Sequence, residues 1–288
     1  MPLAVITIAL DPVLRLSDTS SVRYETIALA IVILLGLAAA AWIGSRTPAA
    51  GPDDDGPGLR IDDLVFICVG AVPGAILGGR LGYVLDHLDF YRANSAAILD
   101  AAQGGLTISL AVPVGILTGA VIARLLGAPV GRWLHVTALP LLFVLAGGKL
   151  VGVLGANGQG AASDLIWATS YAGPGPWGSL AAELPAHPSQ VYEAVAIAVA
   201  IAVLYVATRV GRLSRRNGTA MFLALGLWAV ARVVVGFTWR DGQALGPLGM
   251  EQGLALVVLL VAGLGVAERL RAGDAPAARR LDPGAQSA

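Results

Sequence analysis

The distribution of hydrophobic residues constrains the fold of this chain more than any other feature of its sequence. Seven stretches are each mainly apolar and about 20 residues long, the length that a helix needs to cross the hydrocarbon core of a membrane. Hydrophobic residues make up 56% of the chain, charged residues 13%, and the mean hydropathy is +0.75. These values lie outside the range of soluble globular domains. We therefore expect an all-α integral membrane protein with seven transmembrane helices, at roughly Thr26 to Ile43, Leu64 to Leu85, Leu106 to Leu126, Trp133 to Leu154, Val191 to Thr208, Thr219 to Trp239 and Gln252 to Ala267.

The positions of the basic residues predict the orientation of these helices, because cytoplasmic connections carry an excess of Lys and Arg. Twelve arginines fall in the connections on one side or in the C-terminal region: Arg46, Arg60, Arg124, Arg132, Arg209, Arg212, Arg215, Arg216, Arg269, Arg271, Arg279 and Arg280. Four flank the helices on the other side: Arg15, Arg23, Arg92 and Arg240. We therefore expect the N-terminus outside and the C-terminus in the cytoplasm.

The polar segments predict one membrane domain followed by a tail. Residues 1–271 form the seven-helix transmembrane domain, with a long external loop over residues 156–189 that contains Gly-Pro-Gly-Pro-Trp-Gly at 173–178. Residues 272–288 are polar, which predicts a disordered cytoplasmic tail. The first ten residues have no basic region before their apolar stretch, so we expect no cleaved signal peptide.

Net charge and cysteine content exclude two further features. The formal net charge is zero, whereas a nucleic-acid partner would need a basic surface. The single cysteine, Cys68, lies inside the second apolar stretch, so the chain cannot form an intrachain disulfide. We therefore expect a membrane setting and no nucleic-acid partner.

Three basic residues lie inside or at the ends of the predicted helices, where an unpaired charge is costly. Arg80, Lys149 and Arg232 all fall near the outer ends of their helices, and Glu193 is the nearby anion. If one cation pairs with Glu193, an anionic ligand must neutralise the other two, and in the outer leaflet the abundant anion is a phospholipid phosphate. The planar guanidinium suits phosphate. The alternative is that each cation snorkels to the interface or pairs structurally.

Other polar residues fall at the same depth. Tyr24 lies at the outer end of the first helix, residues 103–109 begin the third, and Tyr192 and Glu193 open the fifth. The segment His187-Pro188-Ser189-Gln190-Val191-Tyr192-Glu193 leads into that fifth helix. A proline at the helix start and a serine cap would by themselves account for part of this segment. A small-molecule transporter, which needs polar residues spread through the membrane, is disfavoured by their clustering at one depth.

Two motifs resemble those of the prolipoprotein diacylglyceryl transferase family, seven-span enzymes of the bacterial plasma membrane. Gly79-Arg80-Leu81-Gly82-Tyr83-Val84-Leu85 is similar to the family's Gly-Arg-(Leu/Ile)-Gly-Tyr-Val-Leu segment. The segment from His187 to Glu193 is similar to the family's His-Pro-Ser-Gln-Leu-Tyr-Glu. Weaker correspondences are Asp11-Pro12-Val13, Tyr24, Gly104-Gly105, Gly160, Arg232 and Gly249-Met250-Glu251-Gln252.

The resemblance implies a function. In the family, phosphatidylglycerol donates its diacylglyceryl group to the thiol of a lipobox cysteine on a preprolipoprotein, at the outer face of the membrane, and glycerol phosphate is released. The expected partners are therefore phosphatidylglycerol, a preprolipoprotein lipobox segment and the membrane. No metal or soluble cofactor is implied. The expected location is the bacterial plasma membrane, as a multi-pass protein.

The resemblance also implies roles for individual residues. The expected catalytic residues are Arg232, Lys149, Tyr24 and His187, and His187 is the only nearby residue on the outer side that could act as a base. The expected substrate-binding residues are Arg80, Gly79, Gly82, Tyr83, Gly104, Gly105, Ser109, Gly160, Tyr192 and Glu193.

Four positions depart from the family pattern. Ser109 stands where the family has a histidine, and Lys149 stands where it has an arginine. Gly152 replaces the family's asparagine, and Gly236 replaces its glutamate four residues after the sixth-helix arginine. Lysine keeps the positive charge but not the planar fork. These departures motivate an alternative hypothesis, a catalytically inactive relative that binds anionic lipid or lipoprotein signal sequences.

Overall fold

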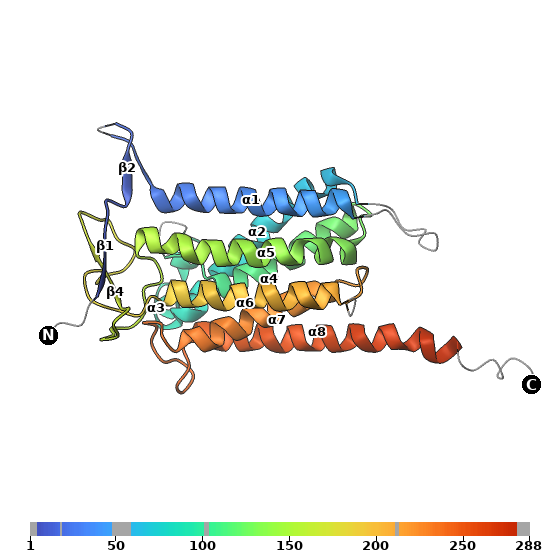
Figure 1. Ribbon diagram of the computed structural model, residues 1–288. Coiled ribbons are helices and arrows are strands. Elements are labelled where there is room, and N and C mark those ends of the chain that lie inside the picture. Colours follow the sequence, from blue (N-terminus) through green and yellow to red (C-terminus); the bar gives the residue numbers. More distant parts are fainter. Residues whose placement is uncertain (1–4, 18, 48–58, 101–103, 211–212, 281–288) are drawn as a thin grey trace, which may run out of the picture.

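The computed structural model describes residues 5–17, 19–47, 59–100, 104–210 and 213–280. Within these ranges, seven helices are long and apolar enough to cross a membrane, which confirms the predicted number. They lie side by side as one bundle (Figure 1). The helices are α1 (Tyr24–Arg46), α2 (Ile61–Asp86), α4 (Ile108–Leu125), α5 (Val130–Gly152), α6 (Ser189–Arg209), α7 (Thr219–Gly236) and α8 (Met250–Arg280).

Strand β1 and the last turn of α8 lie at opposite ends of the bundle (Figure 1), as an odd number of crossings requires. Which end faces the cytoplasm stays a prediction. Helix α8 continues to Arg280, so its backbone is helical through part of the tail that was expected to be disordered. The rest of that tail, residues 281–288, lies outside the described residues.

The expectation of an all-α protein needs a correction at one end of the bundle. Strand β1 (Ile6–Ala9) pairs in parallel with β4 (Thr169–Ala172), and β2 (Val13–Arg15) pairs antiparallel with β3 (Ser21–Arg23). We call strands β1 to β4, together with the connection over residues 153–188, the cap. The protein is therefore mostly helical, with a small β-containing cap over one end of the bundle (Figure 1).

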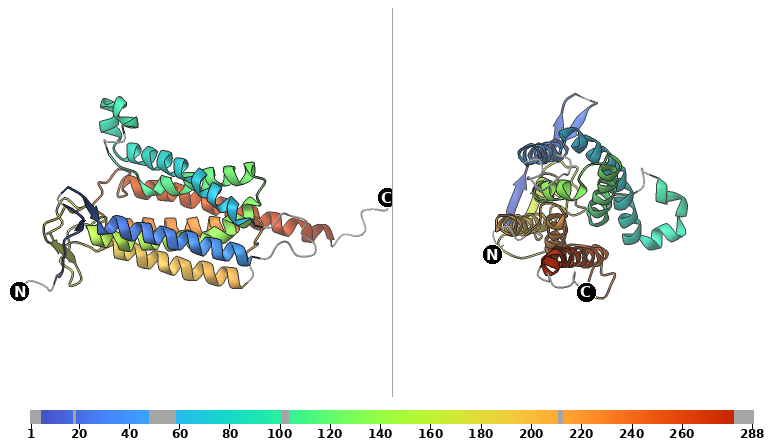
Figure 2. Two further views of the ribbon diagram at one scale, coloured as in Figure 1. Left: turned by 90° about the horizontal axis from the view of Figure 1, so that it is seen from above. Right: turned by 90° about the vertical axis from the view of Figure 1, so that its right-hand side faces the viewer.

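A second group of short elements connects α2 to α4. Helix α3 (Leu88–Ala93) and the 3₁₀ helix η1 (Ser95–Leu99) follow the end of α2. They project sideways from the bundle, as the teal segment in Figure 2 shows. The helices that they join, α2 and α4, lie close together because glycines of α2 face side chains of α4. A Cβ added at Gly74 would lie only 2.1 Å from Thr118 Oγ1.

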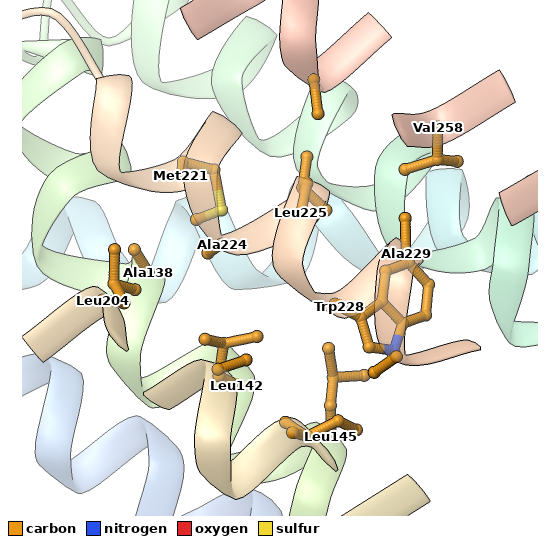
Figure 3. Close-up of a cluster of buried hydrophobic side chains, with 14 of the residues drawn as sticks. Ala138, Leu142, Leu145, Leu204, Met221, Ala224, Leu225, Trp228, Ala229 and Val258 are labelled. Atoms are coloured by element: carbon orange, nitrogen blue, oxygen red, sulfur yellow. The ribbon is translucent and has the colours of Figure 1, made fainter. Parts of the chain in front are cut away.

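Helix α7 is the most enclosed of the seven, because it packs against α5, α6 and α8. Trp228, in the middle of α7, is 1% exposed and packs with Leu142 of α5 and other buried side chains (Figure 3). Because residues four apart lie on one helix face, Arg232 follows Trp228 one turn later and is carried into the interior. The hydrophobic packing of α7 therefore places the charged side chain of Arg232 in the interior of the bundle, at the end that the cap covers.

Candidate active site

A polar cavity of about 350 Å³ lies between the helix ends and the cap. Helices α5, α6 and α7 contribute its charged floor, and the residues after α7 contribute a third cation and a second carboxylate. The cap supplies backbone and amide groups opposite. The lining residues are Lys149, Gly158, Gln159, Gly178, Ser179, Leu180, Gln190, Glu193, Arg232, Trp239, Arg240 and Asp241.

Glu193 bridges two cations on the floor of this cavity. Its Oε1 accepts a hydrogen bond from Arg232 Nη1 at 2.7 Å, and its Oε2 lies 2.8 Å from Lys149 Nζ. Glu193 is fully buried and Arg232 is 3% exposed, so water screens these charges very little. The predicted pairing of Glu193 with a cation is present, and it involves Lys149 and Arg232 together.

Arg232 has a second carboxylate partner, Glu251, from the first turn of α8. Arg232 Nη2 donates to Glu251 Oε2 at 2.6 Å, and Arg232 Nε donates to Ser109 Oγ at 3.0 Å. The hydroxyl of Ser109, in turn, donates to Glu251 Oε2. The guanidinium also lies over the ring of Trp239, 4.6 Å from its centroid. Partners from α4, α6 and α8 thus fix all three guanidinium nitrogens.

The charges of this network cancel. Lys149 and Arg232 contribute two positive charges, and Glu193 and Glu251 contribute two negative charges. The sequence analysis expected three cations against one anion, and that expectation is wrong. The second anion is Glu251, in the first turn of α8, where an acidic residue is also favoured by the helix dipole. We call these four residues and Ser109 the ion network.

The third expected cation, Arg80, lies elsewhere. Its Nε donates to the carbonyl of Ile98 at 2.6 Å, and its Nη2 donates to the carbonyls of Ala97 at 2.6 Å and Asp100 at 3.1 Å. The guanidinium also lies over the ring of Tyr91, at 5.3 Å. The prediction that Arg80 shares one site with Lys149 and Arg232 is therefore wrong. In this structure Arg80 fixes η1 against the end of α2.

The glycines predicted to bind substrate beside Arg80 pack α2 against the start of α4. The backbone N–H of Thr107 donates to the carbonyl of Gly79, and a Cβ at Gly82 would meet the Thr107 hydroxyl. Gly104 has a φ of 98°, and a Cβ there would lie 2.5 Å from the ring of Tyr83. Gly105 also faces that ring. These residues surround Arg80 and do not line the polar cavity.

Only part of the motif at the start of α6 lines the cavity. Gln190 and Glu193 line the cavity. Ser189 is buried, and its hydroxyl contacts Thr238 Oγ1 at 2.7 Å, which ties the start of α6 to the end of α7. Gln190 Nε2 donates to the hydroxyl of Tyr171 in the cap, and burial raises the pKa of that hydroxyl to about 12.

His187 and Tyr192 lie outside the cavity lining. The His187 ring lies 6.0 Å from the Tyr192 ring, and the Tyr192 hydroxyl accepts a hydrogen bond from Trp167 Nε1 at 2.6 Å. Tyr24 begins α1, is 41% exposed and also lies outside the cavity lining. The geometry therefore does not bring His187 or Tyr24 to the ion network.

Gly160 holds the cap to the residues that follow α7. Its N–H donates to the carbonyl of His187 at 2.8 Å, and its carbonyl accepts from Arg240 Nε. A Cβ at Gly160 would lie 2.3 Å from the carbonyl oxygen of Thr238, so only glycine fits there. Gly160 does not itself line the polar cavity, and its role in substrate binding stays a prediction.

Two further cavity residues were missed by the sequence analysis, which counted Arg240 only toward the orientation. Arg240 donates to Ser179 Oγ at 2.8 Å and to Gln159 Oε1 at 3.3 Å, so it anchors the cap. Desolvation by burial, with the negative charges of Asp86 and Glu251, raises the pKa of the Asp241 carboxyl. An Arg-Asp pair directly after an apolar stretch was the signal that could have identified them.

A second, apolar cavity of about 360 Å³ lies deeper in the bundle. Its walls come mainly from α1, α2, α4 and α5, and include Ile33, Leu37, Ala71, Gly115 and Val144. Because its lining is almost entirely hydrocarbon, it favours apolar ligands over polar ones. The protein thus has a charged cavity near the cap and a hydrocarbon-lined cavity within the membrane-spanning region.

Comparison with known proteins identifies the family. A sequence model of the family described as prolipoprotein diacylglyceryl transferase matches residues 22–267. The chain belongs to the prolipoprotein diacylglyceryl transferase family. This confirms the resemblance that was inferred from the motifs at Arg80 and His187.

Individual members of the prolipoprotein diacylglyceryl transferase family match most of the chain. A protein of Beijerinckia indica is 30% identical over 273 residues, which cover 91% of this chain and 94% of the relative. One of Methylocella silvestris is 30% identical over 276 residues, with the same coverage. One of Geobacter sulfurreducens is 30% identical over 239 residues, covering 80% and 86%. All three are named phosphatidylglycerol–prolipoprotein diacylglyceryl transferase.

The structure accounts for three of the departures from the prolipoprotein diacylglyceryl transferase pattern. Ser109 takes part in the ion network. At Gly236 a Cβ would lie 2.5 Å from Gln252 Cγ, so the Gln252 side chain fills the space beside this glycine. At Gly152 a Cβ would lie 2.8 Å from the carbonyl oxygen of Asn157. At Gly236 and Gly152, neighbouring atoms of Gln252 and Asn157 occupy the space that a larger side chain would need.

Proposed function

We propose that the protein transfers the diacylglyceryl group of phosphatidylglycerol to the lipobox cysteine thiol of a preprolipoprotein, at the outer face of the bacterial plasma membrane. Membership of the family supports this activity. The observation that carries it is the buried ion network, of which Lys149, Glu193 and Arg232 form the floor of a polar cavity at one end of a membrane-spanning bundle. A charged cavity at that position suits a lipid headgroup.

Lys149 is the cation that we expect to receive the phosphate. Its side chain is 23% exposed, whereas that of Arg232 is 4% exposed. An ammonium carries three donors, and its ion pair with Glu193 leaves capacity for a phosphate oxygen. The donors of Arg232 already bind Glu193, Glu251 and Ser109. Lys149 therefore contacts the phosphate, and Arg232 acts on it through its electric field.

The acyl chains need a hydrocarbon environment, which the apolar cavity between α1, α2, α4 and α5 offers. Burying apolar surface there is favourable by about 25 cal/mol per Å². The lipid then lies with its headgroup toward Lys149 and its chains toward the centre of the bundle. The orientation inferred from the basic residues puts this headgroup site in the outer leaflet.

The reaction forms a bond between the cysteine sulfur and a glyceryl carbon, and breaks the bond between that carbon and the phosphate oxygen. The oxygen leaves with the bonding electrons as glycerol phosphate. The thiolate is the reactive nucleophile, so the thiol proton needs an acceptor. The leaving group gains negative charge, which fixed positive charges stabilise in a site that excludes water.

Complementation of a transferase-depleted bacterium tests this function. The chain should restore growth and convert a lipobox substrate, and a Glu193→Ala chain expressed to the same level should not. Because Glu193 holds both Lys149 and Arg232, its loss disrupts the phosphate site. If the well-expressed wild-type chain leaves the substrate unmodified while it retains phosphatidylglycerol, the proposal is wrong. That result would favour the inactive lipid-binding relative.

A further inference from the structure

The two carboxylate oxygens of Glu251 have different surroundings. Oε2 accepts hydrogen bonds from Arg232 Nη2 and Ser109 Oγ. Oε1 is buried and has no hydrogen-bond partner in the part of the chain that the structure describes. Glu251 as a whole is 8% exposed. A buried acceptor without a donor costs about 1–3 kcal/mol, so such an atom is a candidate for binding a proton or a donor supplied by substrate.

The other residues near the ion network are less suited to accept a proton. Both oxygens of Glu193 face cations, Arg232 and Lys149. His187, the base expected from the sequence, lies outside the cavity lining, and its ring packs against Tyr192. Glu251 is also outside the lining, but it is bonded to Arg232 of the cavity floor. Ser109 cannot act as a base near neutral pH, and its hydroxyl already donates to Glu251. Asp241 lines the cavity and has no ion pair among the described residues. It is therefore the main alternative to Glu251 as the proton acceptor.

We propose that Glu251 is the general base of the reaction, with Oε1 as the atom that takes the thiol proton of the lipobox cysteine. This inference rests on the proposed transferase function. The sulfur forms its bond to the glyceryl carbon, the phosphate oxygen leaves with the electron pair, and the thiol proton moves to Oε1. Arg232 joins Glu251 to the cavity, because it lines the cavity and binds Oε2.

The neutrality of the ion network gives this proton transfer a second effect. In the resting protein Lys149 and Arg232 balance Glu193 and Glu251. Protonation of Glu251 leaves the network with one net positive charge. The leaving glycerol phosphate gains one negative charge as its bond to carbon breaks. The positive charge therefore develops beside the cavity in the same reaction that charges the leaving group, where a low dielectric strengthens their attraction.

The charged groups around Glu251 come from several elements. Arg232 of α7 contacts it directly, and the charge of Lys149 from α5 acts on the same network. Asp86 at the end of α2 and Asp241 after α7 are the neighbouring carboxylates.

A rate–pH measurement tests the proposal. Purified full-length protein in phosphatidylglycerol nanodiscs would be mixed with a lipobox peptide, and single-turnover rates measured from pH 5.5 to 9.5. Glu251→Gln keeps the shape and an acceptor for Arg232 but removes the base. We expect its rate at pH 7 to fall about 100-fold or more. It should then rise about tenfold per pH unit toward the thiol pKa of about 8.5, while lipid retention by native mass spectrometry stays unchanged.

Two variants complete the experiment. Glu251→Asp keeps a carboxylate and should retain the wild-type shape of the rate–pH curve at a lower rate. Glu268→Gln makes the same change on the same helix, 17 residues further along, and should behave as wild type. A Glu251→Gln rate within threefold of wild type, or a loss equal at every pH, would overturn the proposal and point to Asp241 or to a structural role. Failure of the wild-type protein to transfer would instead reject the proposed function.

Discussion

Arg232 shows how one side chain can organise a site inside a membrane. An isolated charge in hydrocarbon is costly, and it persists only when partners satisfy it. Here carboxylates from α6 and α8 and a hydroxyl from α4 each bind one nitrogen of the guanidinium. The same contacts hold those helices at fixed positions. The residues that satisfy the charge of Arg232 therefore also fix the position of the cavity floor.

Changing Lys149 should separate the effects of charge and shape. In Lys149→Ala the cavity loses its accessible ammonium and Glu193 keeps a single cation. Removing one member of a close charge pair costs about 2–5 kcal/mol, so we expect kcat/KM for phosphatidylglycerol to fall about 30-fold or more. Lys149→Arg keeps the charge and should stay within about threefold of wild type. An alanine variant as active as the arginine variant would contradict the phosphate role of Lys149.

At the level of single residues, the sequence predicted the partners of the network only in part. The pairing of Glu193 with a cation followed from the cost of buried charge. Arg80 and Arg232 could not be distinguished, because each is an arginine near the outer end of an apolar stretch. The two arginines differ because the carbonyls of η1 bind Arg80. The position of η1 depends on tertiary contacts, which a hydropathy pattern does not predict.

The helix pair α2–α4 depends on the absence of side chains. Gly70, Gly74 and Gly78 recur along one face of α2, and an added Cβ at each would lie within 2.6 Å of a side chain or carbonyl of α4. Close approach of this kind brings van der Waals contacts and Cα–H hydrogen bonds between helices in lipid. The pair positions the start of α4, and therefore Ser109, beside Arg232.

Gly74→Val should loosen this pair. The valine Cβ would occupy the position 2.1 Å from Thr118 Oγ1, and overpacking of this kind costs about 1–3 kcal/mol. We expect a lower midpoint of thermal unfolding in detergent and reduced transfer activity. Gly263→Ala is the matched control, since no atom lies within 4 Å of its added Cβ. An unchanged midpoint in Gly74→Val would show that α2 and α4 are not held by this contact.

At the level of elements, the helices were predictable and the strands were not. Seven apolar stretches of sufficient length leave little choice, because only helices satisfy their own backbone in lipid. Strands β1 and β4 each have four residues, and they pair across most of the chain, Ile6 with Thr169. So short a strand has no periodicity to read. Its existence depends on a partner that the local sequence does not reveal.

The orientation of the whole molecule across the membrane can be measured. The basic residues predict that the cap faces outward and that the connection between α6 and α7 faces the cytoplasm. In a Cys68→Ala background, Leu180→Cys in the cap should react with a membrane-impermeant maleimide on intact cells or spheroplasts. Arg215→Cys should react only after lysis. The reverse pattern would invert the orientation and place the ion network at the inner leaflet. Leu180 is fully exposed, so its labelling reports sidedness and not burial.

The parallel pairing of β1 with β4 imposes an order on synthesis. Strand β1 leaves the ribosome before its partner β4, which lies 163 residues later, beyond α1, α2, α4 and α5. Strand β1 therefore stays unpaired until four crossings are complete and residues 169–172 have reached the same side of the membrane. Closing so long a loop is entropically costly unless the intervening helices are already packed. The cap is thus a late step of biogenesis, and the polar cavity that it encloses exists only after the bundle beneath it has assembled.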